Sequence, residues 1–195
     1  MDKKVSLRLS PAFCIMLAMM LLILPLKWLL AAGVAAMYHE LCHIIAIRLC
    51  RGNIYKFSLS SDGASLAVSS LSPAKELICA LAGPMGGLCL LFFARWIPRI
   101  AVCAAFQSLY NLLPIYPLDG GRVLWCSATG LMVENRAMKF CMIVETVCIS
   151  GIVLASLYAT FMLRLGISAL FPSILILAHT KFRKTPCKQW LMRLQ

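Results

Sequence analysis

The sequence predicts an all-α polytopic membrane protein with about six transmembrane helices, a small β-hairpin at the membrane surface and one interrupted helix or loop. Composition is the first observation: 62% of the 195 residues are hydrophobic and 13% are charged, whereas soluble domains are about half apolar and a quarter charged. The second is a mean hydropathy of +0.87. The third is that basic and turn-forming residues separate the apolar runs, as they do between membrane spans. We therefore expect a single domain, 1–195, largely within the bilayer.

The net charge of +12 fits a membrane protein better than a nucleic-acid-binding one, because the basic residues lie between the apolar runs and in the tail at 181–195. Six spans place both termini on one side, predicted to be cytoplasmic by the positive-inside rule. All but four of the 19 lysines and arginines then lie inside. The four outside are Lys27, Arg95, Arg99 and Arg164, and Arg95 and Arg99 fit the rule least well.

The first two spans are expected at about 11–24 and 28–49. The first has basic residues before it, as a signal peptide would, but no small-residue cleavage site follows. Two partly alternating runs, 54–60 and 64–69, flank Asp62-Gly63, which is a strong hairpin signal. The sequence therefore predicts two helices followed by a hairpin at the membrane surface.

The second half of the chain contains an interruption at 114–121, where two prolines, two glycines and an acid occur in apolar surroundings. Irregular backbone at membrane depth is tolerated only when it is buried in protein or lines a cavity. The third span contains Gly83-Pro84 and Gly86-Gly87, which permit close helix approach. The expected helices are a third span at 74–94, a short and interrupted fourth at 97–113, a short helix at 122–131, a fifth span at 137–163 and a sixth at 167–179.

The motif His39-Glu40-Leu41-Cys42-His43 lies within the second span. Two histidines four residues apart share one helix face, so their imidazoles can bind one metal ion. The glutamate between them is placed to activate a water molecule at that metal. Ionisable groups inside a membrane are expensive and usually functional, so the motif indicates a metalloprotease that works within the bilayer.

Two histidines leave a catalytic zinc one protein ligand short. Asp119 is the first candidate, because it lies in the proline- and glycine-rich interruption, where distorted backbone can direct a side chain inward. Glu145, in the middle of the fifth span, is the second candidate; its alternative role is a buried partner for a basic or polar group. Cys42 is a conceivable extra ligand, although simple packing is favoured. His179, at the end of the last span, is interpreted as an interfacial residue.

Two motifs together resemble the site-2 protease family of intramembrane zinc metalloproteases: His39-Glu40-x-x-His43 and Asn111-x-x-Pro114-x-x-Pro117-Leu118-Asp119-Gly120-Gly121. Ala82-Gly83-Pro84 between them resembles a glycine-proline signature of that family. The resemblance covers about 37–122, inside a core of about 28–131. The layout is similar to the bacterial branch that includes stage IV sporulation protein FB, without the C-terminal domain of that protein, which implies a bacterial cell membrane.

The resemblance implies one Zn²⁺ per chain, bound by His39, His43 and Asp119. Glu40 would be the general base and would then deliver the proton to the leaving amine. Asn111 would position the scissile peptide or polarise its carbonyl; its alternative role is a helix-end cap or an interhelical hydrogen bond. The implied reaction is hydrolysis of peptide bonds in membrane-embedded or membrane-tethered proteins, for regulated proteolysis or for clearance of signal-peptide remnants.

The predicted hairpin offers a way to bind such substrates, because transmembrane substrates are helical and must be extended before cleavage. A strand edge can hold an extended peptide through backbone hydrogen bonds. The alternative is a hairpin that only caps the membrane face. The predicted substrate-binding residues are Ile54, Phe57, Leu59, Leu66 and Val68.

Two other functions are compatible with the sequence. One is a catalytically inactive membrane binding protein derived from a protease, although binding alone would not need Glu40. The other is a metal transporter, which would need relay ligands in several spans rather than ligands gathered at one place. The predicted partners are a transmembrane or membrane-tethered protein substrate and the lipid bilayer, with no nucleic acid. A homo-oligomer or an inhibitory membrane partner is also compatible with the sequence.

Overall fold

A computed structural model describes residues 6–9, 25–52, 54–60, 63–68, 71–161 and 173. The chain divides into two compact units, residues 1–112 and 113–195, and each is described by itself. The predicted first span, the basic tail, Asp62 and His179 lie outside the described residues, as does the predicted sixth span except for residue 173.

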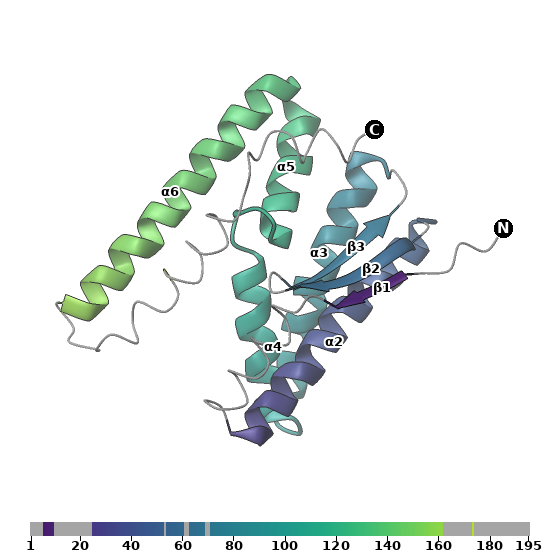
Figure 1. The fold of residues 1–195 in the computed structure, drawn as a ribbon, viewed down its shortest axis with the longest axis vertical. Coiled ribbons are helices and arrows are strands. Elements are labelled where there is room, and N and C mark those ends of the chain that lie inside the picture. Colours follow the sequence, from purple (N-terminus) through teal and green to yellow (C-terminus); the bar gives the residue numbers. More distant parts are fainter. Residues whose placement is uncertain are drawn as a thin grey trace. The chain divides into compact units, whose positions relative to one another are not determined.

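The first unit contains three helices that pack pairwise on one another (Figure 1). They are α2 (Leu26–Leu49), α3 (Pro73–Cys89), which continues into the 3₁₀ turn η1 (Leu90–Phe93), and α4 (Pro98–Asn111). Prolines begin α3 and α4, where a missing backbone N–H costs no helical hydrogen bond. The predicted helices at 28–49, 74–94 and 97–113 are thus confirmed to within a few residues.

Small residues fill the interfaces between these helices. A side chain on Gly87 of α3 would collide with the Ser108 hydroxyl and would lie 3.3 Å from the Ala104 carbonyl of α4. A side chain on Gly86 would collide with the thiol of Cys42 on α2. Such close approach suits helices in lipid, where van der Waals contact rather than burial from water drives packing. The buried residues include Ala31, Ala35, Cys79, Ala80, Ala101, Ala104 and Ser108.

The end of α2 is set by a left-handed residue. Arg51 has a φ of 62°, and its N–H donates to the carbonyl of Arg48 over 3.0 Å. The N–H of Gly52 donates to the carbonyl of Ile47 over 2.8 Å. These two bonds occupy carbonyls that the last turn leaves without helical partners, so the helix ends before the chain enters the sheet.

The first unit also contains a three-stranded sheet in the order β1-β2-β3 (Figure 1). Strands β2 (Ile54–Ser60) and β3 (Gly63–Val68) are antiparallel, with Phe57 opposite Leu66 and Ile54 opposite Val68. The sequence prediction missed β1 (Ser6–Leu9), which pairs with β2 in parallel and places Leu9 opposite Leu59. Consequently β2 is the central strand, paired on both sides.

The second unit contains α5 (Asp119–Leu131) and α6 (Glu134–Phe161), which pack on each other. Helix α5 begins three residues before the predicted start, so Asp119 lies in a helical first turn and not in irregular backbone. An acid is favoured there by the positive end of the helix dipole. A side chain on Gly121 would lie 2.7–2.8 Å from backbone atoms of Ile115 and Tyr116, so glycine lets the preceding segment pack against this turn.

Three helical segments are long and apolar enough to cross a bilayer: Leu26–Leu49, Pro73–Phe93 and Glu134–Phe161. They contain 24, 21 and 28 residues, and about 20 suffice to cross the hydrocarbon core. Large apolar side chains are exposed along them, including Leu41 and Phe92, as expected of surfaces that contact lipid. The chain is therefore a membrane protein, and the total of six spans stays a prediction.

Candidate metal centre

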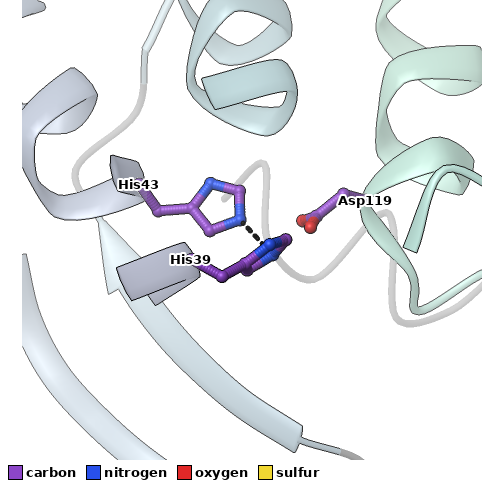
Figure 2. Close-up of side chains that lie close together, drawn as sticks. All are labelled: His39, His43 and Asp119. Atoms are coloured by element: carbon purple, nitrogen blue, oxygen red, sulfur yellow. Dashed lines mark hydrogen bonds between the residues drawn. The ribbon is translucent and has the colours of Figure 1, made fainter. Parts of the chain in front are cut away.

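The two histidines of the motif lie on the buried face of α2. His39 is 2% exposed and His43 is 6% exposed. Their spacing of four residues places both on the same side of the helix, and their Nε2 atoms lie 3.1 Å apart (Figure 2). The predicted pair of imidazoles therefore converges on one point inside the first unit.

The orientation of His43 is fixed by helix α3. Its Nδ1 lies 2.7 Å from the backbone carbonyl of Cys79. A carbonyl only accepts hydrogen bonds, so Nδ1 carries the proton and donates it, and Nε2 presents a lone pair. Histidines that bind metals commonly have this arrangement, because the second bond holds both the tautomer and the ring.

His39 receives a contact from helix α4. The side-chain nitrogen of Asn111, the last residue of α4, lies 3.3 Å from Nε2 of His39. An amide nitrogen donates, so this atom of His39 also acts as an acceptor. Two acceptor nitrogens 3.1 Å apart repel each other unless a proton or a cation lies at the point where they meet. The arrangement therefore fits a metal ion.

Gly83 of α3 closes one side of this pair. A side chain there would collide with Nε2 of His43 and would lie 2.7 Å from Nε2 of His39. Real carbon atoms do not approach this closely, so only glycine leaves the space before the two nitrogens open. Cys79 and Gly83 are one helical turn apart, so one face of α3 both holds His43 and makes room for it.

Asp119 belongs to the second unit, at the first position of α5. Its side chain is 13% exposed, and its carboxylate lies 3.9 Å from Nη1 of Arg122. His39, His43 and Asp119 offer two imidazole nitrogens and a carboxylate oxygen, a donor set that could hold a metal ion.

The other acid and thiol candidates are absent from that donor set in the described part of the chain. Glu145, the runner-up, lines a small cavity in the second unit beside Trp125 and Cys141. The thiol of Cys42 lies where a side chain of Gly86 would fall, which fits the packing role that was favoured. His179 lies outside the described residues.

Glu40 and Asn111 are the remaining residues predicted for the site. Glu40 lies on α2 between the histidines and is half-buried. Asn111 forms the interhelical contact that was its alternative role, and that contact is with His39 itself. Sequence reasoning missed the Cys79 carbonyl, because a backbone acceptor leaves no sequence signature. It marked Gly83 as a point of close helix approach and as part of a glycine-proline signature, but not as the residue that leaves space before the histidines.

A similar fold occurs in a solved structure. The structure is similar to "Site-2 Protease from Methanocaldococcus jannaschii", with a TM-score of 0.62 over 95% of this chain and 94% of that chain. This chain has a site-2-protease-like fold. Sequence identity over the match is 18%, so the likeness extends to the fold. No protein-family model and no curated protein matches the sequence.

Proposed function

We propose that this protein is an intramembrane zinc metalloprotease that hydrolyses peptide bonds of membrane-embedded or membrane-tethered proteins. The observation that carries the proposal is the buried pair of imidazoles, in which Cys79 fixes His43 and both Nε2 atoms face one point. The site-2-protease-like fold supports a membrane metalloprotease. Placement in the bacterial branch, cytoplasmic termini and an oligomeric or inhibitory partner stay predictions.

Asp119 is proposed to join His39 and His43 as the third zinc ligand. Two histidines and a carboxylate are a donor set that zinc takes in catalytic sites, with a fourth position left for water or substrate. When bound, zinc lowers the pKa of water to about 7 and polarises a carbonyl. The alternatives Cys42 and Glu145 are not needed to complete this set.

Glu40 and Asn111 are proposed to perform the proton transfer and the positioning. The Glu40 carboxylate takes a proton from the attacking water as the new carbon–oxygen bond forms at the peptide carbonyl. It returns this proton to the amide nitrogen as the carbon–nitrogen bond breaks, so the products are a carboxylic acid and an amine. The Asn111 amide, 3.3 Å from His39, is placed to donate to a nearby substrate oxygen.

Substrate binding is assigned to β3 instead of β2. Both edges of β2 are paired, one with β1 and the other with β3. A substrate could therefore pair with β2 at Ile54, Phe57 and Leu59 only if it displaced one of these strands. The outer edge of β3, which includes Leu66 and Val68, ends the order of the described sheet. An extended peptide can pair with such an edge through its backbone.

Proline substitutions along β3 test this assignment. Successive N–H groups of an edge strand point alternately toward the paired strand and away from it. Single prolines at Ser65, Leu66 and Ala67 therefore include at least one change that removes an outward donor and leaves the β2–β3 pairing intact. We expect that change to reduce cleavage by about fivefold, because one backbone hydrogen bond to the substrate, worth about 1 kcal/mol, is lost, with zinc content unchanged. Cleavage that persists in all three variants would show that the sheet only caps the membrane face.

Zinc content of the detergent-purified chain is the direct test of the metal site. We expect about one zinc per chain, lost in His43→Ala and reduced by at least about tenfold in affinity in Asp119→Ala, because each removes one of three protein ligands. Cys42→Ala is the matched control within the same motif and should retain zinc.

Other outcomes of that measurement distinguish the alternatives. A folded chain that takes up no zinc would favour the inactive binding protein. Zinc that survives Asp119→Ala but not His43→Ala would assign the third ligand to another residue, with Glu145 tested next. Zinc transport into sealed vesicles without any cleavage would favour the transporter.

A further inference from the structure

The first unit has a cavity of about 300 Å³ where the start of α2 lies beside the start of α4. Its lining combines the cations Lys27 and Arg99, the indole of Trp96 and apolar side chains that include Leu30 and Val34. Lys27 precedes His39 by twelve residues on α2, about 18 Å along a helix. The cavity is therefore separate from the candidate metal centre.

The positive charge of this cavity is not balanced by the described residues around it. None of the described residues that line it carries a carboxylate, and the acids described in the first unit, Glu40 and Glu76, lie elsewhere. Neither Lys27 nor Arg99 forms an ion pair with another described residue. Two such cations in one concave surface attract an anion.

The neighbouring side chains indicate that this anion is attached to a hydrocarbon chain. Trp96 is 72% exposed, and exposed tryptophans of membrane proteins gather at the headgroup level. Leu30 and Val34 follow Lys27 at three and seven residues, so they continue the same stripe of α2 into the bilayer. Arginine pairs with phosphate oxygens through its planar fork, so Arg99 suits a phosphate and the stripe suits an acyl chain.

We propose that this cavity binds an anionic phospholipid. Lys27 and Arg99 hold the phosphate, Trp96 lies at the headgroup, and an acyl chain runs along Leu30 and Val34. The site also gives a reason for basic residues on the predicted outer side of the membrane, where the positive-inside rule disfavours them. The proposal requires only that the chain is a membrane protein and does not depend on proteolysis.

Lipid titration of the full chain in mixed detergent micelles tests the proposal, with phosphatidylglycerol as the anionic probe and phosphatidylcholine as the zwitterionic reference. We expect phosphatidylglycerol to bind more tightly. Each cation near a phosphate contributes about fivefold in affinity. Arg99→Gln should therefore weaken phosphatidylglycerol binding about fivefold, and Lys27→Gln with Arg99→Gln about 30-fold. Phosphatidylcholine binding should fall by less, because its choline ammonium offsets the charge of its phosphate.

Arg95→Gln is the matched control, because Arg95 is an exposed arginine four residues away that does not line the cavity. It should leave phosphatidylglycerol affinity unchanged. Equal losses in Arg95→Gln and Arg99→Gln would overturn the site in favour of general surface charge. Equal affinity for both lipids would also overturn it, and so would glycerol 1-phosphate binding as tightly as the lipid, since the apolar stripe would then contribute nothing. An unchanged circular dichroism spectrum and melting temperature of each variant serve as the check on folding.

Discussion

Replacing Gly83 with alanine is expected to lower zinc affinity by about 10- to 100-fold, because overpacking costs about 1–3 kcal/mol. The new methyl group would collide with Nε2 of His43 and would lie 2.7 Å from Nε2 of His39. The imidazole of His43 cannot move away easily, because its Nδ1 lies 2.7 Å from the carbonyl of Cys79. Cys79 belongs to α3, like Gly83, and lies one turn before it. The methyl group must therefore displace either the helix or the imidazoles.

Gly33→Ala on α2 is the control for that substitution. It makes the same chemical change on the helix that carries both histidines, but no atom lies within 4 Å of the added carbon. Alanine is also the better helix former by about 1 kcal/mol, so Gly33→Ala should retain zinc and full stability. Competition with a chromophoric chelator measures the affinity of each variant. Parent-like affinity in Gly83→Ala would show that the space before the histidines is not required.

Replacing Glu40 with glutamine is expected to lower the cleavage rate by about 10²- to 10⁴-fold, the usual contribution of a general base. Zinc content should remain at the parent level, because the residue lies beside the ligands and is absent from the donor set. The substitution preserves size and removes the ability to take a proton. A substrate can be found by comparing the terminal peptides of membranes that carry the parent or the variant.

Glu134→Gln controls for the loss of one carboxylate, because Glu134 is an exposed residue in the first turn of α6. Its cleavage rate should equal that of the parent in single-turnover assays. Parent-like cleavage by Glu40→Gln would reject Glu40 as the general base. Loss of zinc in the same variant would instead assign Glu40 a part in holding the metal.

Local sequence patterns predicted most of the described helices, because apolar runs between turn-forming residues are short-range signals. Strand β1 was missed for the opposite reason: it has four residues, and its partner β2 lies more than 40 residues away in the sequence. The start of α5 was placed three residues late, because Asp119-Gly120-Gly121 was interpreted as irregular backbone. In the structure these residues begin the helix, and Gly121 admits the backbone of Ile115.

The candidate site was predictable where side chains carry the chemistry. The spacing of His39 and His43 predicted their convergence, and the structure places their Nε2 atoms 3.1 Å apart. The bond from His43 to Cys79 was not predictable, since any residue could supply that carbonyl. The contact between Asn111 and His39 depends on how α4 packs against α2. That packing cannot be predicted from the sequence of either helix alone.

The small residues between α2, α3 and α4 determine which positions of this sequence can tolerate substitution. Inward positions such as Ala35 and Ala80 are fully buried, so added volume there separates helices. Outward positions such as Leu30 and Ile45 are half-exposed or more. Contact with lipid requires an apolar side chain there but no particular one. Most substitutions on the outer surface should therefore be neutral. Two chains under these rules can retain one architecture while sharing as little as 18% identity.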